Sequence, residues 1–290
     1  MRRVLLLGAG GQLGMQLARK LAGETELTAL TRAELDFSDA DALRAAIRSV
    51  RPEIVVNAAA YTAVDKAEQE REAARLVNAV APGVIAEELQ KTDGWLIHYS
   101  TDYVFDGSGS EPWRETDATG PLSVYGRTKL DGELAIAATG CRHVVLRTSW
   151  VYAAEGRNFL HTMLRLGRER DQLRVVDDQI GAPTSAEAIT EATRAVIGQL
   201  ADAGNDVSGI YHLTCSGETS WCGFARAIFE AFAAKQKMPE VVPIPSEAYP
   251  TPAVRPRNSR LNCDKFAGRF GYRMPRWEAA LAEVAGALGS

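Results

Sequence analysis

The sequence has few cysteines and lacks both long apolar runs and a broad excess of charge of one sign. Its four cysteines are Cys141, Cys215, Cys222 and Cys263. None of them stands at a CxxC or other zinc-ligand spacing. This excludes a disulfide framework and a structural zinc site. No apolar run approaches the roughly 18 residues that would span a bilayer. The N-terminus lacks the small-residue cleavage site of a signal peptide, so we expect a cytoplasmic protein without a membrane segment.

The charge is nearly balanced, with 33 basic and 37 acidic residues and a net charge of -4. A protein that binds nucleic acid usually carries a basic field, and this composition offers none. The 46% hydrophobic and 24% charged residues are ordinary for a globular protein, which excludes a disordered or fibrous chain. At 290 residues, the length predicts roughly two domains.

Short apolar runs alternate with helical patterns through the first half of the chain. The runs predict strands at 4–7, 26–30, 54–57, 95–100 and 144–149, and the patterns predict helices at 12–21, 68–89 and 124–138. Ser38 is the expected N-cap of a further helix that ends near Val50. Strand and helix in regular alternation are typical of a Rossmann-type doubly wound parallel sheet in an α/β fold.

After about residue 150 the pattern changes, and six prolines between positions 239 and 256 predict a loop-rich stretch. Helical patterns at 187–200 and 221–234 flank a short apolar strand at 209–214. We therefore expect a first domain over 1–150 and a smaller C-terminal domain over 151–290. The chain is expected to cross back to the first domain near 209–234.

A glycine-rich loop lies where the first strand should turn into the first helix, with glycines at Gly8, Gly11 and Gly14. Such a turn needs a positive φ angle, a backbone that approaches a pyrophosphate closely, and the amide donors of a helix N-terminus. Glycine clusters also occur in purely structural turns. The position after a buried strand nevertheless favours a dinucleotide-binding site.

The end of the second strand bears on the choice of cofactor. A ribose 2′-hydroxyl is usually bound by a carboxylate there, and a 2′-phosphate by an arginine. This sequence has Arg32 and no acid at that point, which favours NADPH, with NADH as the alternative. An exposed surface arginine is the other interpretation of Arg32. Asp36 and Phe37 follow, where an adenine contact is expected.

Tyr125 and Lys129 stand four residues apart, on one face of a predicted helix, and Thr101 follows the fourth strand. The carboxyl edge of a parallel sheet is where ligands bind, so these side chains suit carbonyl reduction. Hydride addition to a ketone leaves an alkoxide that needs a proton, and a nearby cation helps a tyrosine to supply it. Thr101 would hydrogen-bond the ketone oxygen. His98, inside the fourth strand, is interpreted as a hydrogen-bonded core histidine.

With Thr101, Tyr125 and Lys129, the glycine pattern resembles the extended short-chain dehydrogenase/reductases. Longer blocks resemble one branch of them, the dTDP-4-dehydrorhamnose reductase family. These blocks, in order, are Gly11-Gln12-Leu13-Gly14, the stretch 56–68 around Ala60-Tyr61-Thr62, Ser100-Thr101-Asp102-Tyr103, Leu146-Arg147-Thr148-Ser149-Trp150, Pro183-Thr184 and Arg255-Pro256. Together they extend from residue 8 to about 261.

The resemblance implies an enzyme that uses NAD(P)H to reduce the 4-keto group of dTDP-4-dehydro-L-rhamnose to dTDP-L-rhamnose. The first domain would bind the cofactor and the second the sugar nucleotide, in a monomer or a homodimer. On matching positions, Tyr125 is the proton donor, Lys129 the cofactor clamp and Thr101 the residue that tunes the tyrosine. The implied cofactor contacts are Gly11, Gln12, Leu13, Asp36, Phe37, Ala60, Tyr61 and Thr62, and the implied sugar-nucleotide contacts are Asp102 and Trp150.

Two further details of the sequence bear on the type of reaction and on metal binding. Related dehydratases carry an Asp-Glu pair after the threonine, whereas Asp102 is followed by Tyr103, which favours reduction over dehydration. Another sugar-nucleotide epimerase or dehydratase and a non-catalytic NADP-binding regulatory subunit are the alternatives. Some family members bind Mg²⁺ through glutamates at a dimer interface. Here Gln16 replaces one of them while Glu187 is retained, so Mg²⁺ binding is doubtful.

Overall fold

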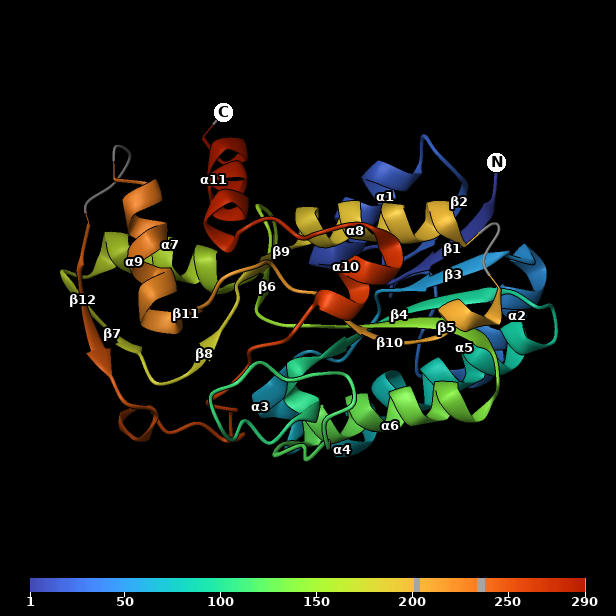
Figure 1. Cartoon of the computed structure of the whole chain (residues 1–290), viewed down its shortest axis with the longest axis horizontal. Helices are drawn as coiled ribbons and strands as arrows, with labels where there is room; N and C mark the ends of the chain where they lie inside the picture. The colour runs from blue at the N-terminus through green and yellow to red at the C-terminus, as the bar shows by residue number, and fades with distance from the viewer. Residues whose placement is uncertain (201–203, 234–237, 290) are drawn as a thin grey trace.

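A six-stranded parallel sheet organises the computed structural model, which describes residues 1–200, 204–233 and 238–289 (Figure 1). In spatial order its strands are β2 (Glu26–Leu30), β1 (Arg3–Leu7), β3 (Ile54–Asn57), β4 (Trp95–Thr101), β5 (Arg142–Thr148) and β10 (Gly209–His212). Each neighbouring pair runs parallel. The predicted Rossmann-type α/β fold is confirmed.

Helices cover both faces of this sheet (Figure 1). Successive side chains of a strand point to opposite faces, so Val4 and Leu6 of β1 join one core cluster while Leu5 and Leu7 join another. The first cluster lies under α1 (Gln12–Leu21), α8 (Ala186–Gln199) and α10 (Asp264–Phe270). The second lies under α2 (Ala40–Val50), α5 (Ala81–Gln90) and α6 (Val124–Ala138). Strands buried on both faces explain the continuous apolar runs in the sequence.

The rest of the chain forms a smaller region at one end of the sheet, on the left of Figure 1. It contains α7 (Phe159–Glu169), α9 (Trp221–Ala231), α11 (Trp277–Ala287) and the short helix η4 (Ser246–Ala248). Three two-stranded sheets accompany them: β7 (Gln172–Val176) with β12 (Glu240–Ile244), β6 (Val151–Tyr152) with β9 (Thr184–Ser185), and β8 (Ile180–Gly181) with β11 (Thr219–Ser220). The chain returns to the main sheet in α8, in η3 (Asn205–Val207) and in β10.

Several local predictions differ from the structure. The N-cap of α2 is Asp39, whose carboxylate accepts the backbone N–H groups of Asp41 and Ala42, whereas the Ser38 hydroxyl bonds Asp36. The predicted helix at 68–89 is interrupted, because α3 (Val64–Ala67) and α4 (Arg71–Arg75) precede a π-helical turn, η1 (Leu76–Val80). The strand predicted at 209–214 ends at His212. The helix predicted over 221–234 ends at Ala231, and Ala234 itself lies outside the described residues.

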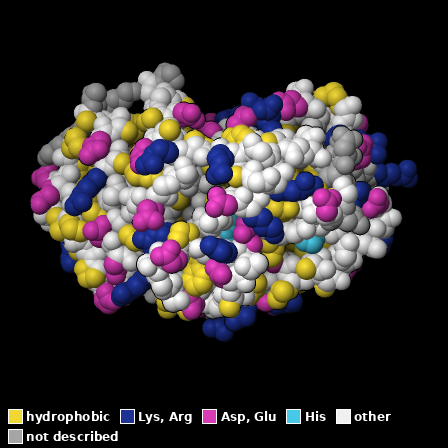
Figure 2. Space-filling model, in the orientation of Figure 1, with side chains coloured by type: hydrophobic (Ala, Val, Ile, Leu, Met, Phe, Trp, Pro, Cys, Tyr) yellow, Lys and Arg dark blue, Asp and Glu magenta, His cyan; other side chains and the backbone are white. Residues whose placement is uncertain are grey.

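Acidic and basic side chains are interspersed over the face of the molecule in Figure 2 and form no broad field of one sign. This distribution agrees with the nearly balanced composition. Among the described helices, none is long and apolar enough to cross a membrane.

Candidate functional site

A cleft of about 770 Å³ opens at the carboxyl ends of β1 and β3, where the order of strands in the sheet reverses. In open α/β sheets this reversal point is where ligands bind. Eight of the residues expected to contact a cofactor line the cleft: Gly8, Gly11, Arg32, Asp36, Phe37, Ala60, Tyr61 and Thr62. The residues are far apart in the sequence, and the fold brings them to one cavity.

The glycine loop forms one wall of the cleft and is shaped by close backbone contacts. Gly8 has a φ angle of 84°, and a Cβ atom on it would lie 2.5 Å from the backbone nitrogen of Ala59. A Cβ atom on Gly14 would lie 2.0 Å from the Gly8 carbonyl oxygen, so glycine lets α1 pack against the loop. The loop therefore brings the N-terminus of α1 to the cleft.

Gln12 and Leu13 were also expected to contact the cofactor, but their side chains do not line the cleft. The side-chain oxygen of Gln12 accepts a hydrogen bond of 2.8 Å from Asn158, which ties α1 to the segment before α7. Leu13 is partly buried and packs on the core cluster beneath α1. Their expected pyrophosphate contacts would be made by backbone amides at the start of α1, which stays a prediction.

The far end of the cleft carries Arg32, Asp36 and Phe37. Arg32 is exposed, while Phe37 is buried against the core cluster below α2. Asp36 accepts hydrogen bonds from the hydroxyl and backbone N–H of Ser38, and these lower the pKa of its carboxyl group. This end thus combines an ionised acid, an exposed guanidinium group and an apolar ring.

The segment with Ala60, Tyr61 and Thr62 is held by Asn78, a residue that the sequence interpretation missed. The Asn78 side-chain oxygen accepts the Tyr61 backbone N–H at 2.8 Å, and its amide donates to the Tyr61 carbonyl and to Thr128, each at 3.1 Å. Asn78 lies in the π-helical turn η1 and is fully buried. An asparagine within an apolar helical stretch was the available sequence signal.

Thr101 and Asp102 lie at the carboxyl end of β4, next to the cleft but outside its lining. Thr101 caps the short helix η2 (Asp102–Val104) by accepting the Tyr103 backbone N–H, and its hydroxyl donates to Asp102 at 3.1 Å. Burial raises the pKa of Asp102 to about 6, against opposing hydrogen bonds from Ser259 and Thr101. The second carboxyl oxygen of Asp102 is buried without a hydrogen-bond partner among the described residues.

Tyr125 lies in the first turn of α6, which is capped by the Ser123 hydroxyl. Burial raises the pKa of Tyr125 to about 12, a hydrogen bond with Thr101 opposes this shift, and the Asp102 charge adds to it. The Tyr125 ring also packs edge-on against Tyr103, with ring centroids 5.5 Å apart. The structure therefore brings Tyr125, Thr101 and Asp102 together.

Lys129 is buried one helical turn after Tyr125, with 1% of its surface exposed. Its Nζ donates to the Tyr99 carbonyl oxygen at 2.6 Å and lies 3.1 Å from Nε2 of His98. Burial lowers the pKa of Lys129 to about 8, and the Glu133 charge opposes this shift. His98 is fully buried, as the sequence interpretation expected.

Trp150 follows β5, two residues beyond the Thr148 that pairs with Thr101. Its φ angle of 50° is rarely adopted by a bulky residue, so the fold holds it under strain. Its indole stacks on that of Trp221, with centroids 3.7 Å apart and planes at 12°. This pair makes a flat aromatic surface on the side of the smaller region.

The surroundings of Glu187 do not fit a metal site. Its carboxylate accepts a hydrogen bond of 3.2 Å from the side-chain amide of Gln16, so a donor stands where a metal would need an oxygen ligand. Within the described ranges, no group of three or more His, Cys, Asp or Glu side chains could hold a metal ion.

The fold and the cleft define a dinucleotide-binding oxidoreductase of the extended short-chain dehydrogenase/reductase class. The model of the family "RmlD substrate binding domain" matches residues 1–289. The chain is 47% identical to the dTDP-4-dehydrorhamnose reductase of Escherichia coli over 97% of this chain and 96% of that protein. It is 46% identical to that of Burkholderia thailandensis over 96% of both chains.

A solved structure is also similar over nearly the whole length. It is the dTDP-4-dehydrorhamnose reductase of Bacillus anthracis in complex with NADP, with a TM-score of 0.91, 34% identity and 98% of both chains covered. The chain belongs to the dTDP-4-dehydrorhamnose reductase family, and the resemblance based on its motifs is confirmed.

Proposed function

We propose that this protein reduces the 4-keto group of dTDP-4-dehydro-L-rhamnose to give dTDP-L-rhamnose, with NADPH as the hydride donor. The observation that carries the proposal is the grouping of Thr101, Tyr125 and Lys129 at the sheet edge beside the cleft. Membership in the reductase family supports the identity of the substrate.

Each of the three side chains has a role in the reaction. When bound, the reduced nicotinamide supplies a hydride to C4 of the sugar. Tyr125 donates its phenolic proton to the former ketone oxygen and becomes a phenolate, which regains a proton from solvent. Thr101 hydrogen-bonds the same oxygen and fixes its orientation. Since burial raises the pKa of Tyr125, a cationic Lys129 is needed nearby to make the phenolate accessible.

Asp102 and Trp150 are proposed to bind the sugar nucleotide. The unpartnered carboxyl oxygen of Asp102 can accept a hydrogen bond from a sugar hydroxyl. Trp150 offers a flat apolar surface to a pyranose ring, and its stacking on Trp221 holds the indole in place. Because Tyr103 follows Asp102, the chain lacks the second acid of the related dehydratases at that position.

The cleft is proposed to bind NADPH, since a similar reductase was crystallised with NADP. The backbone of the loop from Gly8 to Gly14, with Gln12 and Leu13, would contact the pyrophosphate. Arg32 would bind the 2′-phosphate, and Asp36 and Phe37 the adenosine. Ala60, Tyr61 and Thr62 would border the nicotinamide half, with Lys129 holding its ribose.

The division of labour along the chain is part of the same proposal. Residues 1–150 would mainly bind the cofactor and residues 151–290 mainly the sugar nucleotide. Two elements of the second part nevertheless join the first, since β10 is a strand of the main sheet and α8 packs on α1 beside it. The oligomeric state, a monomer or a homodimer, stays a prediction. The four cysteines are free thiols, which suits the reducing cytoplasm.

The experiment that tests the proposal is a spectrophotometric assay of NADPH oxidation with the 4-keto sugar nucleotide. We expect the Tyr125→Phe variant to lower kcat by at least about 10²-fold while NADPH binding persists. Tyr211→Phe is the matched control, because it also removes a buried tyrosine hydroxyl. That hydroxyl, on β10, donates to the Val207 carbonyl of η3. This control should retain wild-type turnover.

Unchanged turnover of Tyr125→Phe would overturn the mechanism. Wild-type protein that binds both ligands without consuming NADPH would instead support a regulatory subunit. Analysis of the product distinguishes the remaining alternative, because an epimerase or a dehydratase would convert a sugar nucleotide without net consumption of NADPH.

A further inference from the structure

His98 and Asn57 form a buried hydrogen-bonded chain with Lys129 between three separate elements. Nδ1 of His98, on β4, lies 3.1 Å from the side-chain nitrogen of Asn57 at the end of β3. Nε2 of His98 lies 3.1 Å from Nζ of Lys129 on α6. All three side chains are at most 2% exposed, so water does not compete for these contacts.

The orientation of the Asn57 amide is fixed by the cleft wall. Its oxygen accepts the backbone N–H of Ala59 at 3.1 Å, which turns its NH₂ group towards Nδ1 of His98. A donor therefore faces Nδ1, and Nδ1 must accept. Because a neutral imidazole carries a single N–H, the proton of His98 is on Nε2 and points at Nζ of Lys129.

An ammonium group at Nζ does not fit this chain of donors. A protonated lysine has three hydrogens and no lone pair, so it would oppose the Nε2–H of His98 with another N–H. A neutral amine accepts that hydrogen with its lone pair and still donates to the Tyr99 carbonyl. A charged His98 would oppose donors at both ring nitrogens, and burial keeps the pKa of His98 well below its ordinary value.

The charges around Lys129 compensate it little. The anion that acts on Lys129 is Glu133, one turn further along α6, and Glu133 is itself bound by Arg147 at 2.6 Å. β4 contributes His98 and Tyr99, η2 contributes Asp102 and Tyr103, and η1 carries no titratable side chain. The neighbouring helices α3, α4 and α5 carry the acids Asp65, Glu72, Glu87 and Glu88. Each of these acids is paired with an arginine and not with Lys129.

We propose that Asn57 and His98 hold Lys129 as a neutral amine and that Nζ takes up a proton when NADPH binds in the adjoining cleft. His98 is then a positioning residue that couples cofactor binding to the charge of Lys129. The hydrogen-bonded chain reaches the cleft directly, since Asn57 immediately precedes Ala58, Ala59 and Ala60, which line the cleft wall. The pyrophosphate of the dinucleotide would lie on the glycine loop, where Gly8 packs directly against Ala59 of that wall, and its negative charge favours the ammonium form. The inference rests on the proposed function for the identity of the cofactor.

The consequence for the reaction is an ordered change of charge. Above about pH 8, Lys129 is mainly neutral in the free protein and becomes cationic when the cofactor is in place, and the cation then lowers the pKa of Tyr125 for proton donation. Since burial lowers the pKa of Lys129 to about 8, the uptake is expected to be largest on the alkaline side of neutrality.

The test is calorimetric titration of the protein with NADPH at about pH 8.5, in two buffers that differ in ionisation enthalpy. We expect uptake of about 0.5–1 proton per site by the wild-type protein and essentially none by Lys129→Met. In His98→Gln an amide oxygen can face Nζ and accept from the ammonium form, so uptake should fall by at least about half. His161→Gln, on α7 in the smaller region, should leave the uptake unchanged.

A second measurement uses the protein without nucleotide and does not depend on the proposed function. Nitrogen-15 NMR of the His98 ring should show the proton on Nε2, and a proton on Nδ1 would overturn the proposal. Binding of NADPH without proton uptake, or equal uptake in His98→Gln, would also overturn it. These outcomes differ from failure of the proposed function, which would appear as full turnover of Tyr125→Phe.

Discussion

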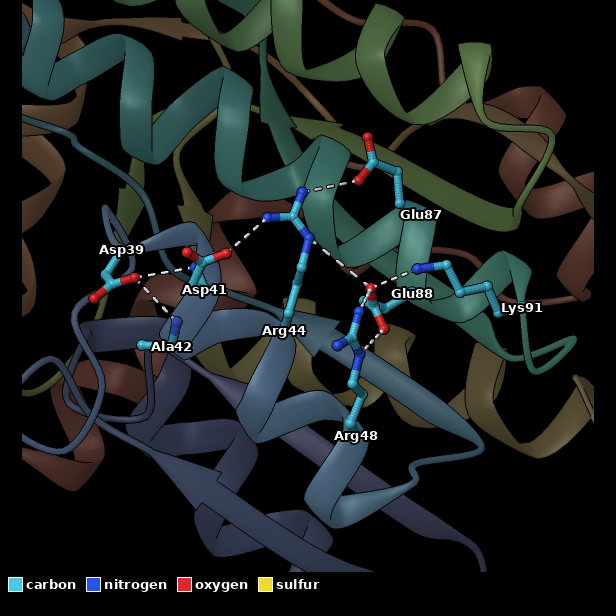
Figure 3. A network of polar contacts seen from close by, with 8 residues as sticks. All are labelled: Asp39, Asp41, Ala42, Arg44, Arg48, Glu87, Glu88 and Lys91. Atoms are coloured by element: carbon cyan, nitrogen blue, oxygen red, sulfur yellow. Dashed lines mark hydrogen bonds and ion pairs between the residues drawn. The ribbon is translucent and has the colours of Figure 1, made fainter.

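Glu88 and Lys129 are both ionisable side chains buried in helices that cover the same face of the sheet, but their surroundings differ. Glu88, 3% exposed on α5, accepts hydrogen bonds of 2.7 and 2.8 Å from Arg48 and one of 2.7 Å from Lys91 (Figure 3). These cations lower the pKa of Glu88 to about 2, chiefly through the Arg48 hydrogen bonds. The acid is held by α2 and by its own helix, and it fastens the two helices together.

Lys129, by contrast, has a carbonyl oxygen and an imidazole as partners of Nζ, and neither carries a charge. Burial consequently lowers its pKa to about 8 instead of stabilising the ion. A buried charge with full compensation contributes to stability, whereas one without it costs free energy that only a function would justify. The difference separates a structural group from a functional one.

The largest expected effect comes from removing Lys129. We expect Lys129→Met to lower kcat by about 10²-fold or more, because the cation that assists Tyr125 is lost. The free energy of unfolding should stay within about 1 kcal/mol of the wild-type value or exceed it, because the substitution removes a buried lysine whose ammonium form lacks a compensating anion. Urea unfolding and steady-state kinetics measure the two quantities. A loss of several kcal/mol would show that Lys129 is structural.

The same comparison shows how far the sequence could lead. Helix 124–138 and the strands at 26–30 and 54–57 were predicted with the bounds that the structure has. Local signals determine two of them, since the Ser123 hydroxyl caps α6 and the strand at 54–57 begins with the apolar run Ile54-Val55-Val56. The grouping of Tyr125 with Thr101 was also predictable, since both stand at positions that parallel topology brings to one edge.

The contacts of Lys129 were beyond local signals. His98 lies 31 residues from Lys129 and 41 from Asn57 in the chain, so only the packed fold reveals the hydrogen-bonded chain. The π-helical turn at 76–80 has a similar cause. A Cβ atom on Gly132 would lie 2.1 Å from the Asn78 carbonyl oxygen, and this close approach of α6 depends on tertiary packing.

Removing the charge of Glu88 should have the opposite outcome to Lys129→Met. We expect Glu88→Gln to lower the free energy of unfolding by about 2 kcal/mol, because hydrogen bonds to charged groups are lost. The kcat of the folded protein should be unchanged, since α2 and α5 lie away from the cleft lining. Urea unfolding with a parallel turnover assay measures both. A loss of activity without a loss of stability would reverse the assignment of roles.

The contribution of Glu88 should depend on pH in the acid range. The folded-state pKa of about 2 lies below the ordinary value of 4.5 for a glutamate, so the unfolded state binds more protons between these values. The stabilisation is therefore fully present above about pH 4.5 and is lost as the pH falls towards about 2. Wild type and Glu88→Gln should converge in stability over this window. A difference between them that stays constant down to about pH 2.5 would contradict the shift.

The smallest effect is expected at Glu87, the neighbour of Glu88 on α5. Glu87 pairs with Arg44 at 3.1 Å, but its side chain is 52% exposed, so water and salt screen the pair (Figure 3). We expect Glu87→Gln to change the free energy of unfolding by less than about 0.5 kcal/mol in urea. Because Glu87 and Glu88 share a helix and both bind arginines of α2, this variant isolates burial as the cause. A loss equal to that of Glu88→Gln would show that charge alone, and not its burial, fastens α2 to α5.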